Sequence, residues 1–408
     1  MVAGMAMFFV LFLFLLFVFV VMVLSFFKQR KFPDFEPNVS IVIPTYNEAR
    51  NIEACIKSIT ADGYPLDKLE IIVVDDGSTD HTREIVRSYP VKLLAQVHKG
   101  KSEAMSFGAR TAAHEFVITL DADSTLKRGC IAALVRPLAD SSIGATTGAS
   151  LVKNSSTLLG MFQNLEYEQN NLIRHSFSKV FGNGIWFMGA LACYRKSLLE
   201  KIGYFKKDTL AEDMDISLEL GRAGYKTYNV KEAACYTIVP ASFKSFYRQR
   251  SRWWIGVLQA LVKNRRISQS PSILFLYVNQ FWWSLYSIIS LPIIAYQVNY
   301  WLPFNSQSFS SVAGYLFRWF TMSGPFYVLY KIPEWGISWY SFFGVLSGLI
   351  STSILLASMG LFKDWRLRNF IALFFYFPYT IWLNLVIFIS LMSYKNIKRT
   401  FFIKEEAK

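Results

Sequence analysis

The sequence predicts an α/β domain placed between membrane-spanning helices. Long apolar runs lie near both ends of the 408-residue chain. Between them, short apolar runs alternate with segments of helical spacing, as in a parallel sheet covered by helices. Only 18% of the residues are charged, against roughly 25% in an average soluble chain. This deficit indicates that part of the surface contacts lipid.

The first apolar run extends from Met5 to Phe27 and contains no charged residue. As a helix it is long enough to cross about 30 Å of hydrocarbon. Lys28, Arg30 and Lys31 follow the run, whereas a signal peptide carries its basic residues before a shorter apolar core. We therefore predict a membrane anchor over residues 1–31 and, because basic flanks stay inside, a cytoplasmic domain after it.

Residues 32–253 form the predicted cytoplasmic domain. Buried strands are expected where branched apolar residues cluster, and amphipathic helices lie between them. The expected strands are Val39–Pro44, Glu70–Val74, Val91–Gln96 and Phe116–Leu120, and the expected helices are Asn51–Asp62, His81–Ser88 and Glu103–Ala113. Ligands of parallel sheets bind at the carboxyl ends of the strands. Acidic residues follow two of these strands, so we expect the site there.

The C-terminal part of the chain is predicted to be a membrane bundle over residues 272–394. Ser272–Val298, Trp335–Phe362 and Leu367–Met392 are apolar enough to span. Ser311–Tyr330 is ambiguous, because Arg318 and Pro325 interrupt it.

Two topologies follow for this bundle. Counting the ambiguous stretch gives four later spans and five in total, which keeps the basic tail of residues 395–408 inside. Without it, the chain has four spans and the tail lies outside. We favour five. Residues 254–271, with Lys263, Arg265 and Arg266, are expected to lie along the inner leaflet.

Charge and cysteine content narrow the possible partners. The formal net charge of +14 suits an anionic membrane surface or a phosphate-bearing substrate. No nucleic-acid recognition motif is present, so we expect no nucleic-acid partner. The four cysteines form no CxxC pair, which favours a reducing compartment and argues against structural zinc.

The first strand ends in a polar cluster. Thr45, Tyr46 and Glu48 offer groups where a nucleotide base and ribose could dock, although an ordinary turn with Asn47 as the helix N-cap explains the pattern equally well.

The second strand ends in Asp75 and Asp76. Capping by Ser78 or Asp80 is the structural alternative here, but capping does not call for two adjacent acids at a strand end. We therefore favour a functional role for the pair.

Asp121 and Asp123 follow the strand Phe116–Leu120. In an extended segment their side chains point the same way. Two hard carboxylates so spaced suit Mg²⁺ or Mn²⁺ bridging a diphosphate, whose leaving charge the ion would neutralise. We therefore predict a metal site at Asp121 and Asp123.

Two further clusters lie closer to the C-terminal bundle. Glu212 and Asp213 precede a segment of amphipathic helical spacing. They would either stabilise its first turn or supply a general base for an acceptor hydroxyl. The sequence Gln249-Arg250-Ser251-Arg252-Trp253 follows. Its arginines can bind a diphosphate and its tryptophan a sugar ring, and a plain juxtamembrane basic belt is the alternative.

Four of these clusters, in this order, resemble the signature of the inverting family 2 glycosyltransferases: Asp75–Asp76, Asp121–Asp123, Glu212–Asp213 and Gln249-Arg250-Ser251-Arg252-Trp253. The closer resemblance is to the membrane synthases of cellulose, chitin, hyaluronan and poly-N-acetylglucosamine. It covers about Val39 to Trp253 and implies a GT-A-type nucleotide-sugar domain inserted between an N-terminal transmembrane helix and a C-terminal transmembrane bundle. Two departures are Met188-Gly189, where many synthases have Cys-Gly or Ser-Gly, and Ala211 in place of a threonine.

The resemblance also implies roles for individual residues. Asp213 would be the general base, with Glu212 beside it. Asp121 and Asp123 would hold Mg²⁺ or Mn²⁺ and the diphosphate. The remaining residues of the donor pocket would be Thr45, Tyr46, Glu48, Asp76, Lys101, Gln249, Arg252 and Trp253.

The expected activity is inverting transfer from a nucleotide-sugar, in the first place a UDP-sugar, to a growing polysaccharide at the cell membrane, with possible coupling to export. The alternative is a non-processive enzyme that adds one sugar to a lipid acceptor. A transporter would carry facing ionisable residues inside its spans, and few are present. The sequence leaves open the sugar and any need for an accessory protein.

Overall fold

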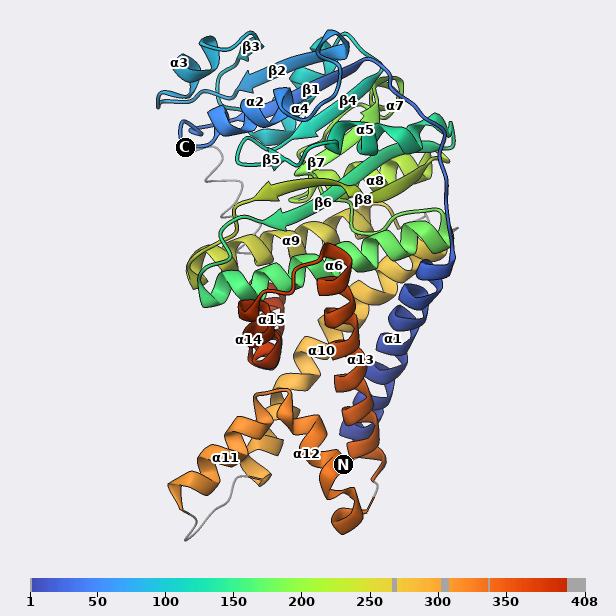
Figure 1. The fold of residues 1–408 in the computed structure, drawn as a ribbon, viewed down its shortest axis with the longest axis vertical. Helices are drawn as coiled ribbons and strands as arrows, with labels where there is room; N and C mark the ends of the chain where they lie inside the picture. The colour runs from blue at the N-terminus through green and yellow to red at the C-terminus, as the bar shows by residue number, and fades with distance from the viewer. Residues whose placement is uncertain (1, 266–269, 302–307, 337, 395–408) are drawn as a thin grey trace.

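The computed structural model describes residues 2–265, 270–301, 308–336 and 338–394. A sheet domain occupies one end of the molecule and a group of long helices the other (Figure 1). The residues predicted in the C-terminal tail, and residues 266–269 of the predicted interfacial segment, lie outside the described part.

One eight-stranded sheet forms the α/β domain, in the order β3-β2-β1-β4-β7-β6-β8-β5. β1 pairs in parallel with β2 and β4, and β2 with β3, whereas β7 is antiparallel to β4 and β6. The strands are β1 Val39–Thr45, β2 Leu69–Asp75, β3 Lys92–Ala95, β4 Phe116–Leu120, β5 Thr125–Leu126, β6 Ile143–Val152, β7 Leu191–Arg195 and β8 Lys226–Thr237. The four predicted strands therefore form the parallel half, and their carboxyl ends share one edge.

Short helices connect the strands and cover both faces of the sheet (Figure 1). They are α2 Ile52–Thr60, α3 Thr82–Arg87, α4 Lys101–Thr111, α5 Cys130–Val135, α7 Lys196–Ile202 and α8 Glu212–Arg222, with 3₁₀ turns at Leu66–Lys68 and Arg136–Ala139. The three helices predicted from the sequence are present with ends shifted by a few residues. Asn51, not Asn47, precedes α2, so the N-cap alternative for Asn47 is wrong.

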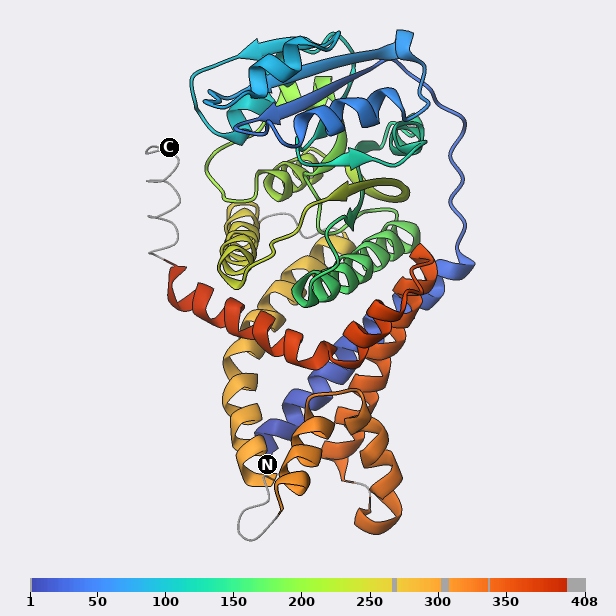
Figure 2. The same ribbon diagram turned by 60° about the vertical axis from the view of Figure 1, so that its left-hand side comes forward.

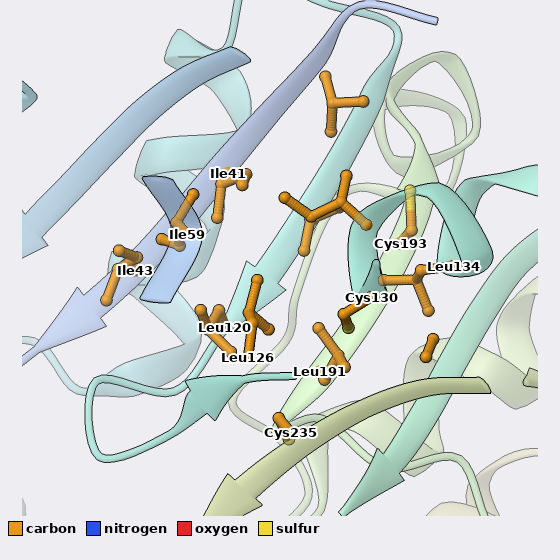
Figure 3. Close-up of a cluster of buried hydrophobic side chains, with 14 of the residues drawn as sticks. Ile41, Ile43, Ile59, Leu120, Leu126, Cys130, Leu134, Leu191, Cys193 and Cys235 are labelled. Carbon is orange, nitrogen blue, oxygen red and sulfur yellow. The ribbon is translucent and has the colours of Figure 1, made fainter. Parts of the chain in front are cut away.

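The core lies on both faces of the sheet because side chains alternate along each strand. Ile41 and Ile43 of β1 pack into the cluster that α2 and α5 cover (Figure 3). Val42, between them, packs on the opposite face with Met105 of α4. The near-continuous apolar run of β1 is thus explained by burial on both sides.

Two long helices separate the sheet from the apolar helices (Figures 1 and 2). They are α6 Leu158–Phe181 and α9 Phe243–Lys263. α9 continues through Trp253 without interruption, so the predicted domain boundary after residue 253 falls inside a helix. Lys263 at its end is paired with Asp208, Asp215 and Glu219, because α9 packs on α8 rather than ending at the motif.

The remaining helices extend away from the sheet. α1 Val2–Phe27 packs against α13 Trp339–Phe362 and α6. The others are α10 Pro271–Trp301, α11 Phe309–Trp319, α12 Ser323–Trp335, α14 Leu367–Phe374 and α15 Tyr376–Met392. Figure 2 shows that α15 crosses the direction of α1 and α13 beneath α9.

Two described helices, Met5–Phe27 and Phe342–Phe362, are long and apolar enough to cross a membrane. A third candidate is the predicted span Leu367–Met392, which the structure breaks into α14 and α15 with a bend of 62°. The predicted span Ser272–Val298 forms most of α10 but is not among these candidates, and it contains the buried polar residues Asn279 and Gln280.

The ambiguous stretch Ser311–Tyr330 is not one helix. It divides between α11 and α12, which meet around Thr321, and the guanidinium of Arg318 lies 4.3 Å from the ring centroid of Tyr327. The described residues therefore provide two or three candidate spans, fewer than the five expected.

Candidate active site

A cavity of about 2170 Å³ lies at the base of the sheet domain and continues between the long helices. Its domain end is lined by Lys101, Asp121, Asp123, Glu212, Asp213, Gln249, Arg252 and Trp253. Residues of α1, α10, α12, α13 and α15 line the remainder. Three of the four predicted clusters thus line one cavity, although more than a hundred residues of chain separate the first of the three from the last.

The predicted metal-binding pair lies in a turn between β4 and β5, not in an extended segment as we expected. The turn closes because the Ser124 amide donates to the carbonyl of Asp121, 3.0 Å away. Both side chains still face the cavity. Burial, together with the charges of the neighbouring Asp121 and Glu48 carboxylates, raises the pKa of Asp123 to about 6.

These carboxylates fit a divalent cation that is bound together with its substrate. In the described part of the chain, no group of three or more His, Cys, Asp or Glu side chains is arranged to hold an ion. Mg²⁺ commonly uses one or two carboxylates together with substrate phosphates. The negative charges of Asp121 and Glu48 help to raise the pKa of Asp123, and a bound cation would offset them.

Lys101 is the cation nearest to this pair. Its ammonium lies 2.6 Å from Asp121 and 3.6 Å from Glu212. Burial alone would lower the pKa of Lys101, but the two carboxylates raise it above its ordinary value. Lys101 therefore stays charged and joins the acidic turn after β4 to the first turn of α8.

Glu212 and Asp213 form the first turn of α8, as predicted. Asp213 accepts hydrogen bonds from the amides of Gly189 and Met214, each at 2.7 Å. Burial raises the pKa of Asp213 to about 6, and the charge of Glu212 adds to this effect. Burial also acts on Glu212, but Lys101 and Arg252 hold the pKa of Glu212 below its ordinary value. Adjacent carboxylates thus have opposite shifts, which suits different roles.

Close backbone contacts place this turn. A Cβ at Gly189 would lie 2.8 Å from the Cβ of Asp213. A Cβ at Gly256 of α9 would lie 2.7 Å from the Cβ of Ala211, directly before α8. Because real Cβ contacts are longer than this, both positions require glycine for α8 to sit where it does.

The α9 motif presents its residues to the cavity from one helix. Arg250 pairs with Glu166 of α6 at 2.6 Å, and its guanidinium lies 4.5 Å from the ring centroid of Trp253. Glu166 also accepts a hydrogen bond from Tyr379 of α15. Arg250 therefore has partners within the protein and orients Trp253, although it lines the cavity together with Gln249, Arg252 and Trp253.

Residues 40–203 match the model of glycosyl transferase family 2. The chain carries a glycosyl transferase family 2 domain. The model stops before Glu212, so the α8 pair and the α9 motif lie in the part of the chain that follows the matched segment.

Comparison with individual proteins agrees with this assignment. The chain is similar to a poly-beta-1,6-N-acetyl-D-glucosamine synthase from Staphylococcus epidermidis, with 28% identity over 60% of each chain. It is also similar to the enzyme of that name from Staphylococcus aureus (strain COL), with 28% identity over 55% of this chain and 56% of the other. The match thus spans less than two thirds of these relatives.

A solved structure extends the comparison to the helices. A mannosyltransferase from Pyrobaculum calidifontis, in complex with GDP-Man and Mn²⁺, aligns with 88% of this chain and 99% of its own at a TM-score of 0.60 and 25% identity. The predicted GT-A-like fold of the family 2 domain is therefore confirmed.

Within the family 2 domain, four residues predicted for the donor pocket do not line the cavity: Thr45, Tyr46, Glu48 and Asp76. The carboxylate of Asp76 is hydrogen-bonded to the loop before α4. It accepts hydrogen bonds from Gln96 and from the amides of Lys99 and Gly100 at 2.6–2.8 Å. In this structure Asp76 orders the chain that leads into Lys101.

The neighbouring Asp75 is also occupied by the protein. It pairs with Arg83 and accepts from the amides of Gly77 and Ser78. Tyr46 stacks on His98 with ring centroids 4.3 Å apart, beside the same loop. The acidic end of β2 therefore builds the turn, which neither the capping nor the ligand interpretation described.

Sequence reasoning missed Arg174 of α6, whose side chain lines the cavity and is 1% exposed. It also missed Glu166 as the partner of Arg250. Charged residues at scattered positions of a long amphipathic helix are usually solvent-exposed, so the local sequence carries no signal for either one.

Proposed function

We propose that this chain is an inverting, membrane-associated glycosyltransferase that moves a sugar from a nucleotide-sugar to an acceptor hydroxyl. The observation that carries the proposal is the shared cavity of Asp213, the Lys101–Asp121 pair and the α9 motif. The half-buried Asp213 carboxylate and groups suited to a diphosphate line the same cavity. The family 2 domain and its named relatives support this reaction class.

The donor diphosphate would lie between the turn after β4 and α9. Lys101 and Arg252 supply positive charge there, and Gln249 can donate a hydrogen bond to a phosphate oxygen. Asp121 and Asp123 are the residues that would hold Mg²⁺ or Mn²⁺, which when bound neutralises charge on the diphosphate. We keep Thr45, Tyr46 and Glu48 as the outer wall of the nucleotide pocket, and Asp76 as the residue that orders the Lys99–Gly100 loop behind it.

Transfer would take place at the cavity wall formed by α8. Asp213 accepts the proton of the acceptor hydroxyl. The oxygen then forms a bond to the anomeric carbon as the bond from that carbon to the diphosphate breaks, and the nucleoside diphosphate leaves with the electron pair. Lys101 and Arg252 stabilise the leaving negative charge. Attack opposite to the leaving group inverts the configuration.

For the acceptor we propose a growing polysaccharide. Named relatives make poly-beta-1,6-N-acetyl-D-glucosamine, and the cavity continues beyond Trp253 among the helices, where a chain could be accommodated. This favours a UDP-sugar donor and a product that meets the membrane. We place the family 2 domain in the cytoplasm and α1 and α13 across the bilayer, with the product leaving along the cavity.

The second candidate is transfer of one sugar to a lipid acceptor. The cavity supports it, because its far end is lined by residues of α1 and α13, which hold the two candidate membrane spans. Product size separates the two candidates: a polymer ladder indicates a synthase, and a single glycolipid indicates the alternative.

The decisive experiment incubates the full chain in lipid with a panel of UDP- and GDP-sugars and Mg²⁺ or Mn²⁺. Nucleotide release and product size are measured together. No released nucleotide with any donor of the panel would contradict the proposed reaction class.

Asp213→Asn tests the base in the same assay. We expect turnover to fall by about 10²–10⁴-fold, the usual contribution of a general base, while nucleotide binding is retained. Wild-type turnover in Asp213→Asn would rule out this carboxylate as the base.

A further inference from the structure

Arg174 is a buried cation without a matching anion. It lies in the middle of α6, is 1% exposed, and forms no ion pair within the described ranges. Its guanidinium donates to Thr147 Oγ1 at 3.1 Å and to the Gly148 carbonyl at 3.2 Å, and its Nε has no partner. Burial lowers the pKa of Arg174 to about 9, an effect that Asp213 partly opposes.

The bond to Thr147 and one further contact of Arg174 lead to Met188, the residue next to Gly189. Arg174 contacts the Met188 sulfur at 2.8 Å, and Thr147 Oγ1 donates to the Met188 carbonyl at 2.9 Å. Arg174 therefore holds Met188 directly through its side chain and indirectly through its carbonyl. The following amide, that of Gly189, donates to Asp213 at 2.7 Å.

The Met188–Gly189 segment has little freedom to move without displacing Asp213. A Cβ at Gly189 would lie 3.0 Å from Asp213 Oδ2 as well as against its Cβ. A shift of the segment would therefore either break the amide hydrogen bond or push the carboxylate. The position of Asp213 thus depends on what fixes Met188.

We propose that Arg174 is a positioning residue that holds the Met188–Gly189 segment, so that the Gly189 amide keeps Asp213 directed at the acceptor. The proposal rests on the base role of Asp213 given above. An unpaired buried cation is costly to a fold, and an apolar side chain would fill the same place in α6. Retaining arginine here is explained by the carboxylate that it serves.

Arg174 is one of several charged or titratable groups around Asp213. Glu212 is adjacent on α8, Lys101 approaches from α4 and Tyr194 from β7, and Arg252 of α9 lies near Glu212. Removing Arg174 takes away one positive charge from this set and leaves the others in place. Protonation of Asp213 should therefore become easier in Arg174→Met, whereas Thr147→Val retains that charge and removes only the hydroxyl.

The test compares Arg174→Met and Thr147→Val with the wild-type chain in lipid, and exposed Arg222→Met on α8 is the matched control. We expect Arg174→Met to lower kcat by about 100-fold, the order of loss that a misplaced catalytic group produces, with unchanged KM for the donor and unchanged nucleotide binding. The midpoint of the acidic limb of the pH–kcat profile moves to higher pH. Thr147→Val lowers kcat without moving that midpoint, and Arg222→Met behaves as wild type.

Two results would overturn the inference. One is a kcat for Arg174→Met that falls only as far as the folded fraction, measured by nucleotide binding. The other is an unmoved midpoint in Arg174→Met together with full activity in Thr147→Val. If Arg174→Met does not fold, Thr147→Val and Arg174→Lys decide, because both keep the charge and loosen Met188. An active Asp213→Asn would instead overturn the proposed base itself.

Discussion

Two strand ends of the sheet carry paired acids, and the structure uses them differently. Asp75 ends β2 and Asp76 follows it; both are almost fully buried and accept hydrogen bonds from the loops around them. Asp121 and Asp123 follow β4 and face the cavity, where Lys101 is paired with one of them. Two acidic strand ends thus lead to one pair that builds the protein and one that is available to a ligand.

The two pairs differ in how many hydrogen bonds their carboxylates already accept from the protein. This difference separates acids with a structural role from acids that can bind a ligand. A carboxylate with several amide donors is already solvated by the protein, and moving it to a ligand would leave those amides unpaired. Asp123 instead has a raised pKa, because burial and the neighbouring carboxylates of Asp121 and Glu48 outweigh the opposing effects of Lys101 and Ser124. Binding of a cation would offset the negative charge at such a site.

Among substitutions at the two acidic strand ends, the largest effect is expected from Asp123→Asn. Turnover should fall by about 10²–10³-fold, the loss typical of removing one electrostatic stabiliser, while stability against denaturant stays equal or rises because carboxylate crowding is relieved. Nucleotide release with Mn²⁺ and a urea titration measure the two quantities. Exposed Asp67→Asn serves as the control. A destabilised Asp123→Asn would place this acid with the structural pair.

Removing the metal tests the same pair without a mutation. Chelation by EDTA should stop nucleotide release by the wild-type chain, and added Mn²⁺ or Mg²⁺ should restore it, since Asp121 and Asp123 alone leave the diphosphate charge uncompensated. Full turnover in EDTA would contradict the metal role of the turn after β4.

A smaller effect is expected from pH. The pKa of Asp213 is raised to about 6, so this carboxylate takes up a proton as the pH falls through that value and loses its function as a base. Turnover should be level above the midpoint and fall by roughly tenfold per pH unit well below it. A profile level down to pH ~4, the ordinary range of Asp, would contradict the raised pKa.

The smallest effect on turnover is expected from Asp76→Asn. The substitution turns an amide donor toward the donors of Lys99 and Gly100, so the free energy of unfolding should fall by about 1–3 kcal/mol. Turnover should drop only about tenfold, through a loosened Lys101, which is the order of one displaced contact. Urea unfolding and nucleotide release measure both. A loss as large as that of Asp123→Asn would return Asp76 to the ligand-binding group.

Much of the fold could be predicted from local patterns. The apolar runs of β1, β2 and β4 are buried on both faces, and the acid-rich start of α8 suits the positive end of a helix dipole. The long helices were harder to assign, because Leu367–Met392 reads as one apolar run, yet α14 and α15 bend by 62°. The composition of a segment indicates whether it can lie in lipid, but it does not indicate where its helix bends.

The sequence by itself determined the family 2 domain, the order of its motifs and the residue types at the site. These features depend on the spacing of residues that are close together in the sequence, so they are evident without a structure. Only the tertiary structure decided that Asp76 accepts hydrogen bonds from the amides of Lys99 and Gly100. It also decided that Arg174 is linked to Asp213 through contacts with Met188 and Gly189. Such relations join residues far apart in sequence, and burial and hydrogen bonding are set only when α4, α6 and α8 pack around one cavity.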